Sequence, residues 1–556
     1  MEMSKVFAAC AATAGANAAP AALRKLDLLS GGQRRFAWKW LAAVLTLASA
    51  SFISSGALAQ TDQRPIIRVS SGAPDVLTLD PDRATSTGDL GMVAEIYSGL
   101  VRFAPGSADP KTLEPDLASS WEVSSDKKIW TFYLRHGVKF HGDWGELTSA
   151  DVVYSLQRAA DPSKSSFAAN YAVIDKVEAT DPYTVRITLK YSDEDFLGRV
   201  SNYHAGFIIS MKAAEKYGSQ FGNHPVGTGP FEFQEHVTQQ YVKLVANESY
   251  FRGKPKLAGI TYRMIPADSD RELAFTSGEL DVVYGEREQR WVERARKRSG
   301  TNVDIFRPGE FSSLFLNIRK PPLDNIKVRK ALAESINLDE MVRFVGADVA
   351  TKGCSAVPPG YLGADCAAGA YPYNVADAKK LLTEAGYPNG VTIKSIVSNL
   401  SGLQSSMEIV QSQLAKAGIK LDMTVVDHST YQAQSRKDMS ALVLYSAARF
   451  PNADTWLTEF YDSRSTVNTP TAMSNFSHCS VADSDIRAAR VEPDPARQLA
   501  YWKSAQQKIH DEICSVPLFD QLQVWVHNDR VVYGYDLKGS MSLAPIITEK
   551  TSLKTQ

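Results

Sequence analysis

The chain has 556 residues, of which 44% are hydrophobic and 22% are charged. These proportions are those of a folded protein with room for two or more hydrophobic cores, and they argue against a disordered chain. The formal net charge of −1 gives no indication of nucleic acid as a partner.

The N-terminal segment has the features of an export signal. Three basic side chains precede an apolar run over residues 40–53, and residues 57–59 supply the small side chains at positions −3 and −1 that a signal peptidase accepts. The run is shorter than the roughly 20 residues that span a bilayer, and no Cys follows it for lipid attachment. We therefore predict a signal peptide over 1–59, cleaved after Ala59, and a free protein in a Gram-negative periplasm.

Two features of this signal stay open. The pair Arg34-Arg35 also permits export by the twin-arginine route, since arginine pairs occur in both kinds of signal. Residues 1–33 are unusually long for the positively charged region, so a later translation start is an open alternative. Removal of residues 1–59 leaves 55 basic and 60 acidic side chains, a net charge of about −5.

A strand and a polar loop come first in the expected mature chain. Alternating side chains predict a strand over 66–71, near whose end Ser70 lies. The loop 85–89 leads into an apolar, helix-like run over 92–100, so Thr87 would lie where a helix N-terminus offers backbone N–H groups. We take Ser70 and Thr87 as candidate ligand contacts. A solvated helix cap explains the loop equally well.

The most specific pattern in the chain lies within residues 113–156. Alternating aromatic and polar side chains predict a strand that ends near Leu134. Thr148 and Asp151 have the spacing of a capping box and predict a helix that begins there. In the same block, the phrase L-A-x-S-W-x-x-S-x-D-x-x-x-x-T-F-x-L-R-x-G-V-K-F-H resembles the signature of the solute-binding proteins of peptide-type ABC importers, the dipeptide, oligopeptide and nickel-binding family.

This resemblance, with further similar blocks at 225–231, 321–331 and 376–390, implies both a fold and a function. The implied fold is α/β: a two-lobe clamshell of the periplasmic-binding-protein type (type II, or cluster C-like), with an extra strand-rich subdomain in the first lobe. The implied function is to capture a small molecule or peptide and deliver it to an inner-membrane ABC permease with its cytoplasmic ATPase. Such a receptor is a monomer and needs no cofactor.

We expect the first lobe to be discontinuous in sequence. Lobe I is predicted over 60–315 and again over 519–556, with the strand-rich subdomain over about 100–230, and lobe II is predicted over 316–518. Lobes of this kind close around a ligand by a hinge motion confined to the few residues that cross between them.

The second lobe is expected to contain a parallel sheet. Strands and helices alternate over 392–425, and this order is typical of parallel strands joined by helical crossovers. Ser398 and Asn399 would follow the carboxyl end of a strand, where open α/β sheets bind their ligands. Ordinary solvation of a loop explains these two residues nearly as well.

The segment 448–457 departs from the family pattern. Peptide-binding relatives resemble Asp-Tyr-Pro-Asp-Pro-Asp-Asn-Phe here, and the resemblance implies that the first Asp meets the ammonium group of the ligand. This chain has Arg449 at that position, and a planar guanidinium suits a carboxylate or phosphate. We hypothesise a ligand with an anionic head, such as an opine, a sugar phosphate or a differently held peptide. The alternative is a shifted alignment in which Arg449 pairs with Asp454.

Aromatic and polar neighbours complete the candidate site. Trp456 and Trp525 offer faces on which a ligand can stack, although each is more typical of a hydrophobic core. Asn452 and Asp454 flank Arg449 and are included as candidate contacts.

No catalytic arrangement emerges from the sequence. The chain has no Gly-x-Ser-x-Gly elbow, no His-Glu-x-x-His zinc motif and no complete phosphate-binding loop. We therefore predict a binding protein and not an enzyme, with no metal site. A secreted hydrolase with the same lobes is the alternative from another class, and a sensory protein that presents its ligand to a membrane receptor is a third possibility.

Four cysteines follow the expected cleavage site: Cys354, Cys366, Cys479 and Cys514. In an exported protein they predict two disulfides. Of the three pairings we favour Cys354–Cys366, because the two are close in sequence, and Cys479–Cys514 as the remaining pair. A metal site is the competing interpretation, but none of the pairs has the short spacing of a zinc ligand set.

Overall fold

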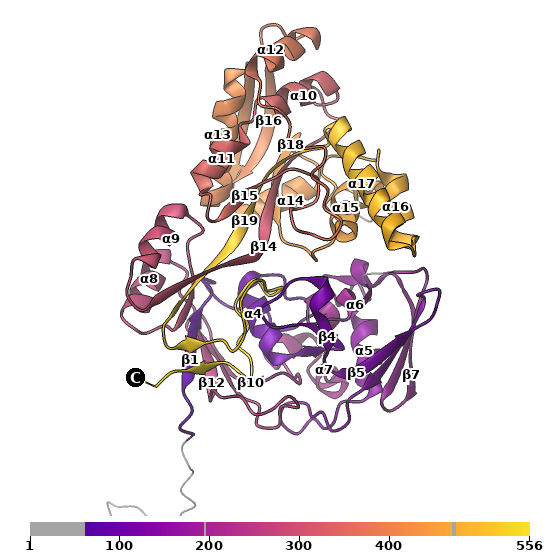
Figure 1. The fold of residues 1–556 in the computed structure, drawn as a ribbon, viewed down its shortest axis with the longest axis vertical. Helices are drawn as coiled ribbons and strands as arrows, with labels where there is room; N and C mark the ends of the chain where they lie inside the picture. The colour runs from indigo at the N-terminus through magenta and orange to yellow at the C-terminus, as the bar shows by residue number, and fades with distance from the viewer. Residues whose placement is uncertain (1–61, 194–195, 470–473, 556) are drawn as a thin grey trace, which may run out of the picture. The chain divides into compact units, whose positions relative to one another are not determined.

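A mixed sheet of eleven strands runs through the computed structural model of the protein, which describes residues 62–193, 196–469 and 474–555 (Figure 1). Its strand order is β10-β11-β12-β1-β13-β19-β14-β18-β16-β17, and β15 pairs with β19 outside this path. The expected signal peptide lies outside the described residues. The strands of the sheet are β1 (Ile66–Ser70), β10 (Phe231–Val237), β11 (Tyr241–Ala246), β12 (Gly259–Arg263), β13 (Val282–Tyr284), β14 (Thr301–Leu316), β15 (Ala350–Lys352), β16 (Val391–Ser398), β17 (Ile419–Val426), β18 (Leu442–Ala447) and β19 (Ser515–Asn528).

Two long strands occupy the middle of the sheet and join the lobes. β14 and β19 pair antiparallel from Thr301 opposite Asn528 to Phe315 opposite Ser515, with register shifts between Phe306 and Glu310 and between Ser312 and Ser313. The lobe crossings expected at 315–316 and 518–519 both fall inside these strands. The lobe boundaries themselves stay a prediction.

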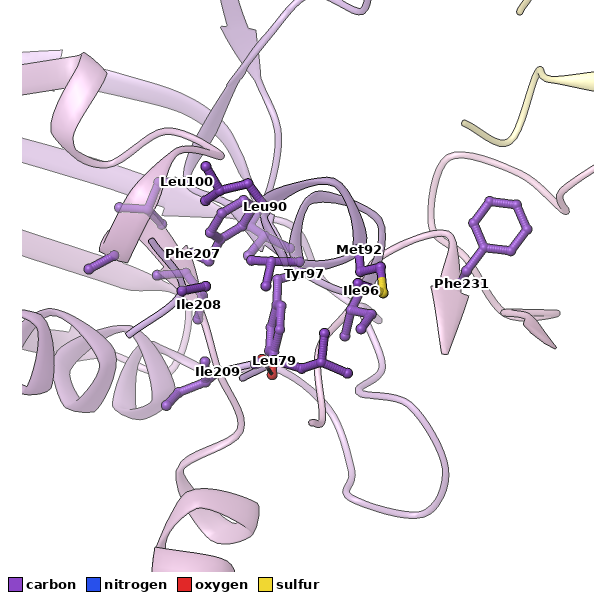
Figure 2. Close-up of a cluster of buried hydrophobic side chains, with 14 of the residues drawn as sticks. Leu79, Leu90, Met92, Ile96, Tyr97, Leu100, Phe207, Ile208, Ile209 and Phe231 are labelled. Atoms are coloured by element: carbon purple, nitrogen blue, oxygen red, sulfur yellow. Dashed lines mark hydrogen bonds between the residues drawn. The ribbon is translucent and has the colours of Figure 1, made fainter. Parts of the chain in front are cut away.

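Lobe I is built around the first hydrophobic core. At its centre, helix α4 contributes Leu90, Met92 and Ile96 to the cluster of buried side chains that also contains Phe207 and Ile208 (Figure 2). A four-stranded antiparallel sheet, in the order β5-β6-β8-β7, lies within the region where the strand-rich subdomain is expected. The elements here are α4 (Thr87–Ile96), β2 (Ser98–Gly99), β3 (Val101–Phe103), β4 (Leu113–Pro115), β5 (Ala118–Val123), β6 (Ile129–Leu134), α5 (Ser149–Ala159), β7 (Ile174–Asp181), β8 (Thr184–Leu189), α6 (Phe196–Arg199), β9 (Phe207–Ile208), α7 (Met211–Tyr217), β20 (Val531–Val532) and β21 (Ser552–Leu553).

Two further hydrophobic cores lie around the other end of the sheet. β16 and β17 are parallel, with Val391 opposite Ile419, which confirms the strand–helix–strand prediction. The buried side chains of Leu280, Trp291 and Val292 belong to the second core. The helices of this part are α8 (Asp268–Thr276), α9 (Gln289–Arg296), α10 (Ile326–Glu334), α11 (Leu338–Val345), α12 (Val375–Glu384), α13 (Ser401–Lys416), α14 (His428–Arg436), α15 (Ala453–Tyr461), α16 (Asp483–Val491) and α17 (Pro495–Glu512).

Capping side chains determine where several helices begin. The helix expected over 92–100 is α4, which begins five residues earlier because the side chain of Ser86 accepts a hydrogen bond from the backbone N–H of Asp89. The predicted helix start at Thr148 is confirmed, and the carboxylate of Asp151 accepts from the backbone N–H of Thr148 at 3.0 Å.

Both favoured disulfides are present. The Cα atoms of Cys354 and Cys366 are 5.2 Å apart, and those of Cys479 and Cys514 are 5.9 Å apart. The second bridge ties the chain just before β19 to a buried position of the third core. Over residues 62–193, 196–469 and 474–555, no helix combines the length and the apolarity that crossing a membrane requires.

A buried carboxyl group joins α4 to the C-terminal segment. Glu95 is fully buried, and its Oε1 accepts from the hydroxyl of Tyr262 at 2.9 Å and from the backbone N–H of Ile547 at 3.2 Å. Burial raises the pKa of Glu95 well above its ordinary value, although these hydrogen bonds oppose the shift.

Replacement of Glu95 by Gln is expected to stabilise the protein at pH 8 and to change little at pH 4. A raised pKa means that the folded state holds its proton more tightly than the unfolded state does. The stabilising contribution of Glu95 is therefore lost as the pH rises above the ordinary pKa of a carboxyl group. The amide of glutamine does not titrate, so the variant does not lose stability in this way. Thermal unfolding of both proteins from pH 4 to pH 8 measures the difference. Glu215→Gln on the exposed face of α7 is the control and should give no pH-dependent change.

Candidate functional site

A cavity of about 1030 Å³ lies between the lobes. Its lobe I wall comes from α4, from residues 166–171 and from α6 with the loop after it. Its opposite wall comes from α13, α14 and the chain that follows β18, and its floor comes from β14 and β19. A small organic ligand fits in a volume of this size.

The charged side chains that line the cavity are mainly arginines. Among the described residues that line the cavity, four are arginines, two are glutamates and none is aspartate or lysine. Each glutamate is already held by an arginine: Arg287 Nη2 lies 3.1 Å from Glu310 Oε2, and Arg449 Nε lies 2.5 Å from Glu459 Oε2. The remaining two lining arginines are Arg199 and Arg436. The lining side chains thus include two more arginines than glutamates, and Asp193, which does not line the cavity, offsets the charge of Arg199 through an ion pair of 2.6 Å.

Arg449 lines the cavity on the wall opposite lobe I, where it is part of the chain that follows β18. Its Nη1 donates to the carbonyl of Ala448 at 2.9 Å, and its guanidinium lies 5.6 Å from the ring centre of Phe460. Burial disfavours its charge, but the charge and hydrogen bond of Glu459, with smaller contributions from Tyr445 and Tyr203, together raise the pKa of Arg449. Its internal partner is thus Glu459. The alternative pairing with Asp454 is wrong, because Asp454 lies in the first turn of α15 and bonds Arg490 at 3.0 Å.

Three predicted contacts near Arg449 serve the local structure. Asn452 is the N-cap of α15, and its Oδ1 accepts from the backbone N–H of Thr455 at 2.9 Å. Trp456 is 1% exposed and packs edge-on against Phe311 in the third core. The described residues that line the cavity do not include Asn452, Asp454 or Trp456.

The remaining predicted contacts divide between the cavity and its surroundings. Thr87 lines the cavity. Ser398 is buried behind the wall and bonds Nδ1 of His428 at 3.0 Å. Ser70 and Trp525 are buried in lobe I, and Asn399 is exposed. The structure thus brings together Thr87 and Arg449 in the cavity wall, and the role of all nine residues as ligand contacts stays a prediction.

Several residues that line the cavity carry no distinguishing signal in the sequence. Arg287 lies in a charged, surface-like stretch, and Glu310 is a single acidic residue between Gly309 and Phe311. Nothing local distinguishes either of them from a solvated side chain. His204 also lines the cavity, where its ring is stacked between Phe167 and Tyr203 at centroid distances of 4.1 and 3.6 Å. Burial, with a smaller contribution from the charge of Arg449, lowers the pKa of His204 well below its ordinary value, so the ring is neutral.

An apolar contact joins the two walls beside Arg449. The ring of Phe450 packs against Phe103 of lobe I at a centroid distance of 5.9 Å and belongs to a small cluster with Met541. Gly198 of α6 lies directly against this ring: a Cβ atom at Gly198 would be 2.0 Å from Cζ of Phe450. The contact therefore depends on the absence of a side chain at position 198.

Known proteins are similar to this chain in sequence and in architecture. Residues 112–468 match the model of the bacterial extracellular solute-binding proteins, family 5. The glutathione-binding protein GsiB of Salmonella paratyphi A is 32% identical over 501 residues, which cover 88% of this chain and 94% of that protein.

Solved structures of binding proteins are also similar to this chain. MoaA from A. tumefaciens R10, in complex with mannopinic acid, is 46% identical with a TM-score of 0.82, and the match covers 88% of this chain and 100% of that one. DppA from Helicobacter pylori, in complex with the peptide STSA, is 27% identical with a TM-score of 0.77, over 88% of this chain and 98% of that one. The two-lobe α/β fold predicted from the sequence is thereby confirmed, and the chain belongs to the family 5 solute-binding proteins of ABC importers.

Proposed function

We propose that this protein captures a small anionic solute of the opine type in its cavity and delivers it, in the periplasm, to an inner-membrane ABC permease. The observation that carries this proposal is the charge of the cavity wall, where arginines outnumber carboxylates and each glutamate already bonds an arginine. Arginine forks bind carboxylates through two parallel, charge-assisted hydrogen bonds. A relative that binds mannopinic acid supports the opine class, since it is 46% identical to this chain.

An acidic peptide is the second candidate ligand. The relative GsiB is a glutathione-binding protein, and DppA was solved with a peptide. Arg449 argues against peptides held by their ammonium group, because a guanidinium repels that charge.

Calorimetric titration of the mature protein tests the proposal. The panel consists of mannopinic acid, glutathione, the dipeptide Met-Leu and a hexose 6-phosphate, each also assayed by the shift in thermal midpoint. We expect mannopinic acid to bind most tightly and the dipeptide, which has an ammonium group at its amino end, to bind least. Tight binding of Met-Leu with no binding of the acids would show that the charge of the wall does not select the ligand.

Arg449→Ala is expected to weaken binding of the preferred acid about 10- to 100-fold. A hydrogen bond to a charged group contributes roughly 1.5–3 kcal/mol, and each 1.4 kcal/mol is tenfold in affinity. The same titration measures the change. Arg296→Ala, on an exposed arginine of α9 that pairs with Asp348, is the control and should leave affinity unchanged. Equal affinity of the Arg449→Ala variant and the wild type would remove Arg449 from the site.

Export and release of an unaltered ligand complete the proposal. The family is extracellular, and the apolar segment before Ala59 supports cleavage after that residue. N-terminal sequencing of protein from the periplasm tests the cleavage site. Native mass spectrometry of the same material distinguishes a receptor, which carries an intact solute and is monomeric, from a hydrolase, which converts the panel compounds.

A further inference from the structure

Two arginine–glutamate pairs lie on opposite sides of the cavity floor. Arg287 follows β13 by three residues, and Arg449 follows β18 by two. Between β13 and β18 lie β19 and β14, so the two strand positions are three spacings, about 14 Å, apart.

Both arginines also reach the same level along the strands. The carbonyl of Arg287 accepts from the side chain of Gln521, which pairs with Glu310 in the sheet. On the other side Ala447, two residues before Arg449, pairs with Phe311, the neighbour of Glu310. The floor between them offers two hydroxyl groups, because Ser312 and Ser446 of the adjoining strands also line the cavity.

Arg287 is bonded far less completely than the structural arginines of this protein. Arg329 donates five hydrogen bonds to described residues, and Arg271 donates four. The side chain of Arg287 donates one, from Nη2 to Glu310. Its Nη1 is buried and has no hydrogen-bond partner within the part of the chain that the structure describes. A buried guanidinium nitrogen without a partner costs free energy unless a ligand accepts from it.

We propose that Arg287 is a second anion-binding residue of the site, and that the ligand is an elongated organic acid with a negatively charged group at each end. One end meets Arg449, and a carboxylate at the other end accepts from Nη1 of Arg287. This inference rests on the proposed function, and it narrows the ligand class from an anionic solute to a two-ended acid.

The arrangement also assigns a role to Glu310. Its carboxylate holds Arg287 in place through Nη2, and Gln521 fixes the backbone of Arg287 from β19. The negative charge of Glu310 competes with the ligand's carboxylate for the same guanidinium. A substitution that removes the charge of Glu310 but keeps the shape of its side chain should therefore strengthen ligand binding. A substitution that removes the guanidinium of Arg287 should weaken ligand binding.

The test compares Arg287→Gln, Glu310→Gln and the surface control Arg263→Gln with the wild type, using mannopinic acid and glutathione as probes in calorimetric titrations at two salt concentrations. We expect Arg287→Gln to bind the probe that the wild type prefers 10- to 100-fold more weakly, with a smaller dependence on salt. Glu310→Gln should bind it several-fold more tightly, and Arg263→Gln should match the wild type. A purely structural role for the pair does not give opposite signs, and thermal midpoints of the free proteins check their folding.

Each other result has a distinct meaning. If the wild type binds a probe and Arg287→Gln binds it within twofold, the inference is wrong and the proposed function stands. If Glu310→Gln weakens binding, Glu310 accepts from the ligand and the assignment of a carboxylate to this end is wrong. If the wild type binds neither probe in either salt, the proposed function fails and this inference fails with it.

Discussion

Gly198→Ala is expected to weaken ligand binding by about 10- to 100-fold without unfolding the protein. The added Cβ would lie 2.0 Å from Cζ of Phe450, far inside contact distance, so the ring cannot stay where it is. Overpacking of this kind costs typically 1–3 kcal/mol. Phe450 and Gly198 belong to opposite walls of the cavity. The substitution is therefore expected to destabilise the contact between the lobes and not the hydrophobic cores within them.

Calorimetry with mannopinic acid and glutathione measures the affinity, and small-angle X-ray scattering measures whether the ligand still makes the protein more compact. Gly91→Ala in α4 is the matched control, since a Cβ there meets no described atom closer than 3.6 Å. In a protein that already carries Phe450→Ala, the Gly198→Ala change should cost little, because the two positions are coupled by direct contact. Equal losses in both backgrounds would show that the clash with Phe450 is not the cause.

Arg158→Ala is expected to lower the free energy of unfolding by about 3–5 kcal/mol, the usual cost of removing one partner from a buried ion cluster. Arg158 on α5 holds two buried carboxylates: Nη2 lies 2.6 Å from Asp80 Oδ2, and Nη1 bonds Asp82. Burial raises the pKa of Asp82 to about 7, against the opposing charge of Arg158. These contacts fix the chain that leads to Thr85 and Thr87 of the cavity wall.

Urea unfolding followed by circular dichroism measures this loss. The loss should be smaller at pH 5 than at pH 8, because carboxylates that take up protons no longer require a positive partner. Arg83→Ala, an exposed neighbour whose side chain bonds the carbonyls of Ser163 and Lys164, is the control and should cost under about 1 kcal/mol. A similar loss for both variants at both pH values would contradict a specific role of the buried cluster.

Much of the fold could be predicted from the sequence because its signals are local. The capping box at Thr148 and the strand that ends at Leu134 follow from spacing within a few residues, and the parallel pair β16 and β17 follows from the order of consecutive elements. The apolar run predicts a start of α4 that is too late, because the cap at Ser86 begins the helix before that run.

The candidate site was less predictable, because it is assembled by the order of strands in the sheet. Arg287 and Arg449 are far apart in sequence, and only the succession β13-β19-β14-β18 places them across one floor. Trp456 and Trp525 lie in hydrophobic cores. A lone aromatic residue gives no local indication of whether it faces a core or a cavity, so the sequence left both possibilities open.

The shared sheet has a consequence for any attempt to divide the protein. β14 and β19 pair along almost their whole lengths, and each has a further neighbour in the sheet. A fragment that carries one of them without the other would expose a long row of unpaired backbone N–H and C=O groups, a template for aggregation. The halves of this receptor are therefore not separable modules, and truncated forms should be designed to retain both central strands.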